Sequence, residues 1–586
     1  MAIKRAAVVV GVNTTGELTP LESAVAGADE VAAWLNGEGF DVAKLTDAAK
    51  PVTAAAIRKA VTKFVKSGTY DQLVLYFSGH GYWKNNAELW LLSKAPGDAD
   101  EAVSWVETIE LARDSGIPHV VVISDACRSI PQTSTGMRVR GSVVFPNNPT
   151  NTRVQPKIDK LQASLMGAAA YEVVLPNTSK AKTSVFTHCL RKAYTNPDAD
   201  MVLKVAKGKR TVEVVPNRRL EAFLKREVPA VLNSVSVAYQ QLPVIDVPAD
   251  DSMYIGQVRR PMAVGITGAA APPATPITVN DVARAAVAAE LSPAGLPIGG
   301  LRRMRGGAAA AASKQLSAMR SVIEAPHPVA RFESWTGFTV SGADIQGAVP
   351  GKGGRLDRAG DEHPNEAAVR IWMNSGKRHC SVAITFGDGN GTVLPALHGY
   401  IGHITVAGGG VSNVSYVPSS NSTRWPEYLK RKNEIDRLRS AVSAAASLGA
   451  LRLGKEHARA FAERVRVQKQ FDPTLGLYAA YAYAEAGLYD EVRSVRTYMF
   501  EDLGVSLFDV AMLDRTSRKA DWIARQGVVP FCPMLSQGWY YLRPRGMKLP
   551  RVLEGAQDEL VQSLWTTFNE THMRRINRAL REGRLT

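Results

Sequence analysis

Two short stretches of the sequence end apolar runs in residues that do nucleophilic chemistry. Residues 77–83, FSGHGYW, contain His80, and residues 122–129, VISDACRS, contain Cys127. A cysteine attacks a carbonyl as a thiolate, and a neighbouring histidine draws it into that form and then protonates the leaving amine. The pair therefore predicts a peptidase site, provided that the fold brings the two side chains together.

The elements around this pair alternate between strand and helix patterns. We expect strands at 6–13, 41–47, 71–80 and 119–127, with helical stripes at 21–35 and 57–64 between the first three. Such alternation predicts an α/β fold, in which a parallel sheet carries helices on both faces. Ligands of open parallel sheets bind beyond the carboxyl ends of the strands. His80 and Cys127 both stand at such ends, on strands that we expect to be neighbours.

The spacing and the flanking residues carry a family resemblance. Cys127 lies 47 residues after His80, and caspases place their histidine about 50 residues upstream of Q-A-C-[RQG]-G. Ala126, Cys127 and Arg128 match that signature, whereas Asp125 and Ser129 replace its glutamine and glycine. Residues 5–255 thus resemble the caspase-type cysteine peptidases, and Asp-x-Cys is similar to the metacaspase and paracaspase branch.

The resemblance implies a caspase-type three-layer fold with a mostly parallel sheet and assigns a role to each motif residue. Cys127 is the implied nucleophile and His80 the implied general base and acid. The N–H groups of Gly81 and Cys127 are the implied oxyanion hole, and Gly81 has no side chain to obstruct a substrate.

Substrate preference follows from the residue two positions before the cysteine. In metacaspases an aspartate at this position receives arginine or lysine, and Asp125 fits it. No arginine occurs in 11–21, where caspases that cleave after aspartate carry one. We therefore expect cleavage after Arg or Lys, with Glu172 as a second pocket wall. Arg128 departs from the branch, because metacaspases usually carry histidine there.

Two functions remain open at this point. The first is a cysteine endopeptidase that acts on protein substrates and cleaves itself in 128–162 or in the linker sequence LRRMRGG. The long segment 128–162 reads as a loop that holds Arg138, Arg140, Arg153, Lys157 and Lys160. The second is an inactive caspase-fold scaffold that binds partners through 328–586. The intact Gly-His-Gly and Asp-x-Cys motifs favour the first.

Composition limits the remaining possibilities. A chain of 586 residues exceeds one core, and its four scattered cysteines form neither a disulfide framework nor a zinc motif. We expect no metal and no cofactor. The net charge of +16 comes without a nucleic-acid-binding motif, so we expect nucleic acid not to be the main partner. Apolar runs are too short to span a membrane. These features predict a cytoplasmic protein.

The rest of the chain divides by composition into three further parts. We expect the caspase-like domain at 1–258 and an Ala/Gly/Pro-rich linker at 259–327, with one short helix at 279–290. A small β-rich domain is expected at 328–425, and an α-helical domain with a hairpin of the tetratricopeptide type at 426–586.

Three other candidates have plainer readings. His379-Cys380, with His363 and His398, lacks zinc-ligand spacing. Residues 388–391, DGNG, read as a hairpin turn rather than a calcium loop. His188 and Cys189 lie on a helical pattern and are expected to pack.

Overall fold

The structure is a computed structural model that divides into two compact units, residues 1–276 and 277–586. It describes residues 3–259 and 332–585, apart from internal gaps of which the longest are 148–155, 174–181, 358–367, 448–458 and 515–527. The expected helix at 279–290 and the linker sequence LRRMRGG lie outside the described residues. The domain boundaries drawn from the sequence stay predictions.

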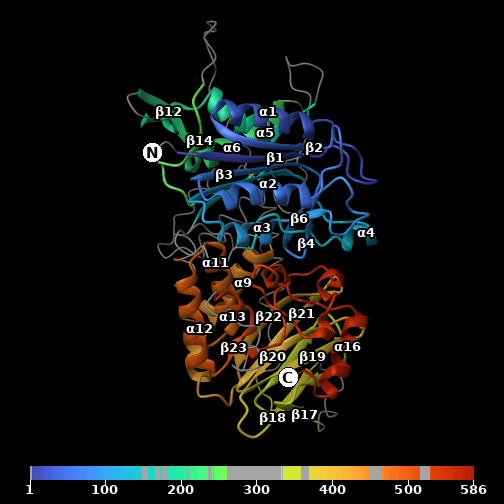
Figure 1. The fold of residues 1–586 in the computed structure, drawn as a ribbon. Helices are drawn as coiled ribbons and strands as arrows, with labels where there is room; N and C mark the ends of the chain where they lie inside the picture. Colours follow the sequence, from blue (N-terminus) through green and yellow to red (C-terminus); the bar gives the residue numbers. More distant parts are fainter. Residues whose placement is uncertain are drawn as a thin grey trace. The chain divides into compact units, whose positions relative to one another are not determined.

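A six-stranded sheet forms the middle of the first unit (Figure 1). Its order is β13-β8-β7-β3-β1-β2, and every neighbouring pair is parallel except β13 with β8. The strands are β1 (Arg5–Gly11), β2 (Phe40–Thr46), β3 (Gln72–Gly79), β7 (His119–Ala126), β8 (Lys157–Gln162) and β13 (Val244–Asp246). The mostly parallel sheet predicted from the strand–helix alternation is confirmed. The two central strands β3 and β7 are buried along their whole length.

Helices cover both faces of this sheet (Figure 1). One face carries α1 (Ala24–Gly37), α5 (Val185–Thr195) and α6 (Leu220–Ser234), and the other carries α2 (Ala54–Ser67) and α3 (Trp105–Ala112). Apolar residues of α1, α5 and α6 pack on those of β1, β3 and β7 in one buried core that includes Cys189. The three-layer α/β fold and the packing role of Cys189 are therefore confirmed.

A small antiparallel sheet follows His80 directly, and the sequence reading did not anticipate it. Its strands are β4 (Gly81–Lys84), β5 (Ala87–Leu91) and β6 (Ala102–Ser104). The turn between β4 and β5 uses Asn85 and Asn86, both with positive φ, which asparagine tolerates better than most residues. Every residue of the three strands is buried.

The reading of 128–162 as one loop is wrong at its end, because β8 begins at Lys157. The strand was not predicted because it contains Asp159 and Lys160, and charged residues are rarely buried unless they are paired. Lys160 pairs with Asp246 at 2.6 Å, and Asp159 accepts a hydrogen bond from His119 at 2.8 Å. Buried pairing thus replaces the apolar pattern expected of an inner strand.

Short elements complete the first unit. They are α4 (Ser134–Met137), β9 (Glu172–Val173), β10 (Thr183–Ser184), η1 (Ala199–Met201), β11 (Leu203–Lys207), β12 (Arg210–Pro216), η2 (Asn217–Arg219) and β14 (Tyr254–Gln257).

The strands expected in the β-rich part of the second unit form two sheets. One has five strands in the order β17-β18-β15-β21-β22, and the other has three in the order β16-β19-β20. The strands are β15 (Gly337–Ser341), β16 (Ile345–Pro350), β17 (Gly354–Leu356), β18 (Ala368–Met373), β19 (His379–Phe386), β20 (Gly391–Leu397), β21 (Tyr400–Ala407) and β22 (Gly410–Pro418). Residues 387–390 join β19 to β20, so the hairpin turn predicted at 388–391 is confirmed.

Helices dominate the same unit from residue 425 onward. They are α9 (Trp425–Ser447), α11 (Pro473–Glu485), α12 (Tyr489–Leu503), α13 (Phe508–Leu513), α15 (Trp539–Leu542) and α16 (Glu570–Arg581). Also present are β23 (Ser506–Leu507), β24 (Val528–Val529), η5 (Ser536–Gly538), η6 (Arg551–Leu553) and η7 (Ala556–Glu559). The helices α11 and α12 pack against each other as a helical hairpin within the range 426–586 where one was expected. Among the described residues, no helix combines the length and the apolar character that crossing a membrane requires.

Candidate active site

The register of β3 and β7 brings the two predicted catalytic residues to one edge of the sheet. Gly79 and Ala126, the last residues of the two strands, are direct partners in the parallel pairing. His80 directly follows β3 and Cys127 directly follows β7. Both are partly exposed, whereas the strands that carry them are buried.

The backbones beyond these residues continue side by side. Tyr82 and Ser129 form an isolated parallel bridge, and the N–H of Trp83 donates to the Ser129 carbonyl at 2.7 Å. A Cβ atom placed on Gly81 would fall 2.3 Å from the carbonyl oxygen of Cys127. The structure thus brings the predicted base, the glycine and the predicted nucleophile together. Among the described residues, no hydrogen bond joins His80 to Cys127.

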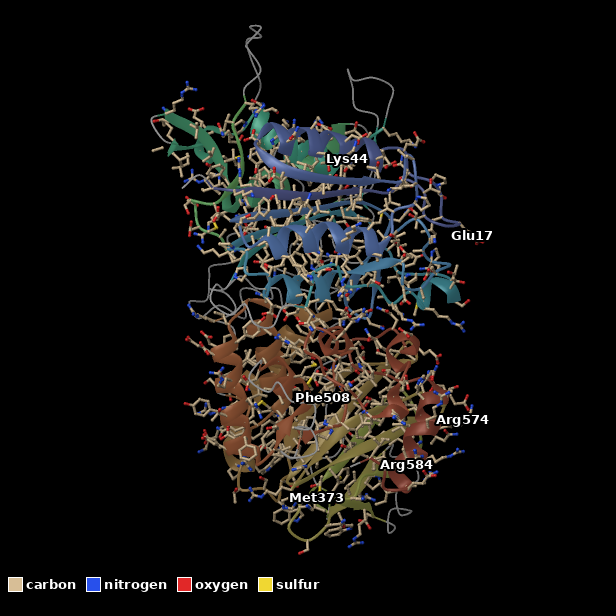
Figure 2. The ribbon with its side chains drawn as sticks, in the orientation of Figure 1. Glu17, Lys44, Met373, Phe508, Arg574 and Arg584 are labelled. Atoms are coloured by element: carbon tan, nitrogen blue, oxygen red, sulfur yellow. The ribbon has the colours of Figure 1, made fainter. Side chains whose placement is uncertain are left out.

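A main-chain oxygen orients the histidine ring. The Nε2 atom of His80 lies 2.8 Å from the carbonyl oxygen of Thr19. Thr19 belongs to the loop between β1 and α1, where Glu17 lies at the outer edge of the unit (Figure 2). A carbonyl only accepts hydrogen bonds, so Nε2 carries the proton. In the neutral ring Nδ1 then holds the lone pair, which suits a general base.

Backbone groups hold the thiol of Cys127. Its Sγ donates to the carbonyl of Ala170 at 3.6 Å, and the N–H of Ala170 donates to Sγ at 3.4 Å. Burial raises the pKa of the thiol above its ordinary value, and the charges of Asp125 and Glu172 raise it further. The thiolate therefore does not form readily without a nearby base.

Asp125 lies in β7 with its side chain on the face covered by α5. Its Oδ2 atom accepts hydrogen bonds from the hydroxyls of Ser184, of Thr187 at 2.5 Å and of Tyr76 at 3.4 Å. Only 4% of the residue is exposed. Burial raises its pKa, and the hydroxyl donors offset part of this rise. The predicted pocket acid is thus a buried carboxylate near Cys127.

Glu172 lies nearer the surface and holds the beginning of α1. Its carboxylate accepts from the N–H groups of Glu22 and Ser23 at 3.0 Å and from the Ser23 hydroxyl at 2.7 Å. Glu172 is the pairing partner of Ser184, whose hydroxyl donates to Asp125. Ala170, two residues before Glu172, contacts the thiol of Cys127. The two predicted pocket residues therefore lie close to the predicted nucleophile.

Arg128, which stands where metacaspases usually carry histidine, has a buried side chain. Its side chain is 3% exposed and pairs with the buried carboxylate of Glu88 at 3.2 Å. A histidine at this position would lack the planar, permanently charged guanidinium group that makes these contacts.

Comparisons with known proteins place the first unit in a family. Residues 4–247 match the family model of the caspase domain. These residues form a caspase domain. The predicted family is confirmed for this part of the chain, and the match includes every site residue predicted from the sequence.

Two solved structures are similar to part of the chain. A protein from Geobacter sulfurreducens is 17% identical, covers 45% of this chain and 100% of its own, and has a TM-score of 0.29. Caspase-1 from Spodoptera frugiperda is 12% identical, covers 42% of this chain and 86% of its own, and has a TM-score of 0.27. A comparison with curated proteins gives no match.

Sequence reasoning missed two participants in the site of the caspase domain. Thr19 contributes a main-chain oxygen, which every residue type carries, so no residue pattern could have revealed it. Glu88 could have been found, because a glutamate between Ala87 and Leu89 in an apolar stretch signals a buried charge that needs a partner. Within 3–259 and 332–585, the described residues form no group of three or more side chains placed to bind a metal ion.

Proposed function

We propose that the caspase domain is a cysteine endopeptidase that hydrolyses peptide bonds after arginine or lysine. The observation that carries the proposal is the pairing of Gly79 with Ala126, since it sets His80 beside Cys127 at the carboxyl edge of the sheet. The family match supports a peptidase of this class acting on protein substrates.

The proposed reaction uses His80 as base and then as acid. Nδ1 takes the proton of the Cys127 thiol, and the thiolate attacks the carbonyl carbon of the substrate. The N–H groups of Gly81 and Cys127 stabilise the oxyanion that forms. The imidazolium then protonates the leaving amine, and the C–N bond breaks to leave an acyl-enzyme. Water activated by the same ring hydrolyses this thioester and restores the thiol.

The proposed preference for Arg and Lys is supported by the acidic surroundings of Cys127. Asp125 forms the buried floor of the pocket and Glu172 its outer wall, and no cation paired with either carboxylate is found among the described contacts. A buried carboxylate gains more from a cation than from any neutral partner, because the interior screens charge weakly. A cationic substrate side chain would thus supply the missing charge partner of a carboxylate that is already shielded from water.

Self-processing is a further part of the proposal. Arg138 and Arg140 are exposed in the segment after the nucleophile, whereas Lys157 and Lys160 lie in β8 and pair with Asp250 and Asp246. We therefore place self-cleavage before β8 or in the linker sequence LRRMRGG. Intact masses of wild type and Cys127→Ala before and after prolonged incubation test this, and a wild-type chain that keeps the full mass expected from its sequence contradicts it.

A peptide panel tests the principal proposal. Wild-type protein and Cys127→Ala are incubated with peptides that differ only in the residue before the scissile bond. We expect the wild type alone to release the group that follows Arg or Lys. Cleavage after aspartate contradicts the pocket assignment and keeps the dyad, whereas equal inactivity of both proteins favours the alternative, an inactive scaffold that binds partners through 328–586.

A further inference from the structure

A buried carboxylate binds the residue that follows the candidate nucleophile. The Oε2 atom of Glu88 lies 3.2 Å from Nε of Arg128, and the two side chains are 0% and 3% exposed. The guanidinium of Arg128 stacks on the ring of Trp83 at 4.4 Å. Its Nη1 atom donates to the carbonyl of Ser164 at 3.0 Å. Arg128 is thus held from three directions immediately after Cys127.

Three further donors complete the surroundings of Glu88. The indole N–H of Trp90 donates to Oε1 at 2.8 Å. The Ser124 hydroxyl donates to the same oxygen, and the Gln162 amide donates to Oε2. Ser124 and Gln162 lie on β7 and β8, so the carboxylate joins the small antiparallel sheet to the main one. The cost of removing a charge from water is offset only when the charge is paired and hydrogen-bonded in this way.

The same contacts reach the segment that carries the candidate base. Glu88 and Trp83 lie on the β4–β5 hairpin, whose first residue, Gly81, directly follows His80. The N–H of Leu91 at the end of β5 donates to the carbonyl of His80 at 2.9 Å. The hairpin therefore contacts the backbone of the histidine at one point and the side chain after the cysteine at another.

We propose that Glu88 is a positioning residue that holds Cys127 and His80 in their reacting arrangement through Arg128. Fixing the Arg128 side chain fixes the backbone of Cys127, and with it both the thiol and the N–H that faces the oxyanion. The proposal rests on the proposed function, because it assumes that this cysteine and this histidine react. A displacement of about 1 Å in such a pair is enough to cost roughly a hundredfold in rate.

A role in stability alone does not account for this arrangement. Apolar residues of similar size stabilise a core as well as a buried ion pair does, or better. The pair also occupies a particular place, since one partner adjoins the nucleophile and the other lies on the hairpin after the base. An apolar replacement of the pair would keep the packing but would no longer hold the backbone beside Cys127 in place.

Glu88→Gln is the decisive variant, because it removes the charge and keeps the shape. Asp246→Asn is the matched control: Asp246 pairs with the buried Lys160 at 2.6 Å in the same unit, and Lys160 lies opposite Val122 in the middle of β7 rather than at its carboxyl end. Each protein is assayed as full chain for its melting temperature, for kcat and KM on an Arg peptide, and for the alkylation rate of Cys127. Peptide mapping isolates Cys127 from the other three cysteines, all of which are buried.

We expect Glu88→Gln to lower kcat at least tenfold, with KM within threefold and with alkylation near neutral pH slowed to a similar degree. Asp246→Asn should keep both rates while its melting temperature falls as far or further. Arg128→Gln should reproduce the loss, and the double variant should lose little more than either single one, since both act through one contact.

The outcomes separate this proposal from the function on which it rests. Wild-type rates of cleavage and alkylation in Glu88→Gln overturn the positioning role, as do losses no larger than those of Asp246→Asn. Absence of peptide cleavage in the wild type contradicts the peptidase instead. Alkylation needs no peptide and still decides whether Glu88 controls the thiol.

Discussion

The Nε2 atom of His80 donates to the carbonyl oxygen of Thr19 across 2.8 Å. This contact leaves Nδ1 as the basic nitrogen of the ring. In the proposed reaction, the same contact makes Nδ1 the atom that takes the proton of Cys127. The oxygen belongs to the main chain, so its position depends on the path of the loop between β1 and α1.

The reactivity of Cys127 should depend on His80 over a defined pH range. Burial raises the pKa of the thiol, so in His80→Ala we expect alkylation to be slow at neutral pH and to rise only in strongly alkaline solution. Wild-type protein should react at least tenfold faster near pH 7, because the imidazole takes the proton. Rates of iodoacetamide labelling between pH 5 and 10 test this expectation. Superimposable profiles for the two proteins would rule out a dyad.

Gly81 should not tolerate a side chain. The Cβ of Gly81→Ala would fall 2.3 Å from the Cys127 carbonyl oxygen, and that oxygen is backbone that cannot rotate away. We expect kcat to fall roughly a hundredfold, the usual cost of a displacement of about 1 Å in the reacting groups. Gly97→Ala is the control, since its nearest contact is an ordinary 3.5 Å. Full activity in Gly81→Ala would contradict the close approach of the two loops.

Asp125→Asn should separate substrate preference from the reactivity of the thiol. Losing one partner of a buried charge pair costs about 2–5 kcal/mol, so we expect kcat/KM on Arg peptides to fall at least thirtyfold. The charge of Asp125 raises the pKa of Cys127, so alkylation should stay equal or become faster. A parallel fall in both rates would show that Asp125 supports the reacting pair and not the pocket.

Glu172→Gln supplies the comparison at the rim of the pocket. Its charge is partly exposed and its oxygens hold the backbone of Glu22 and Ser23. We expect a smaller loss of kcat/KM than in Asp125→Asn, because solvent screens the charge. Values of kcat/KM for the same Arg peptide and for a matched neutral peptide measure the loss in each of the two variants.

A buried acid in the second unit should make stability depend on pH. Burial raises the pKa of Asp509 from 3.8 to about 6, although the Tyr481 hydroxyl and the Met534 N–H both donate to it. Between these values the native carboxyl keeps a proton that the unfolded chain has released, so folding becomes less favourable as the pH rises through this range. Asn does not titrate. The melting temperature of Asp509→Asn minus that of wild type should therefore increase from pH 4 to pH 7.

The size of that change is limited by linkage. A difference of about two pKa units corresponds to about 3 kcal/mol. Asp490→Asn, a change to a carboxylate whose side chain is 91% exposed in α12, is the matched control. A temperature difference that stays constant with pH in Asp509→Asn would contradict the raised pKa.

The sequence predicted the elements that follow from hydrophobic periodicity. Strands β1, β3 and β7 are buried on both faces, so their apolar runs were visible, and the residues after them identified the edge of the sheet. The strand β8 was hidden, because Asp159 and Lys160 are buried as hydrogen-bonded and paired charges. Such pairing depends on residues that lie far away in the sequence.

The candidate site was predicted only as far as side chains reveal it. His80, Gly81, Cys127 and Asp125 stand in recognisable motifs. The contact with Thr19 could not be predicted, because every residue type carries a main-chain carbonyl. The partner of Arg128 comes from a hairpin that periodicity did not predict, because its strands are short.

The two strands that precede His80 and Cys127 are inner strands of the sheet, with hydrogen-bonded neighbours on both sides. Glu172 and Ala170, by contrast, belong to the chain between β8 and α5, outside that sheet. A change confined to the side chain of Glu172 therefore leaves both strands unaltered, whereas a change in the backbone at Ala170 reaches the thiol of Cys127. Under the proposed function, substitutions at Glu172 would thus change the substrate preference while the strands that precede His80 and Cys127 stay the same.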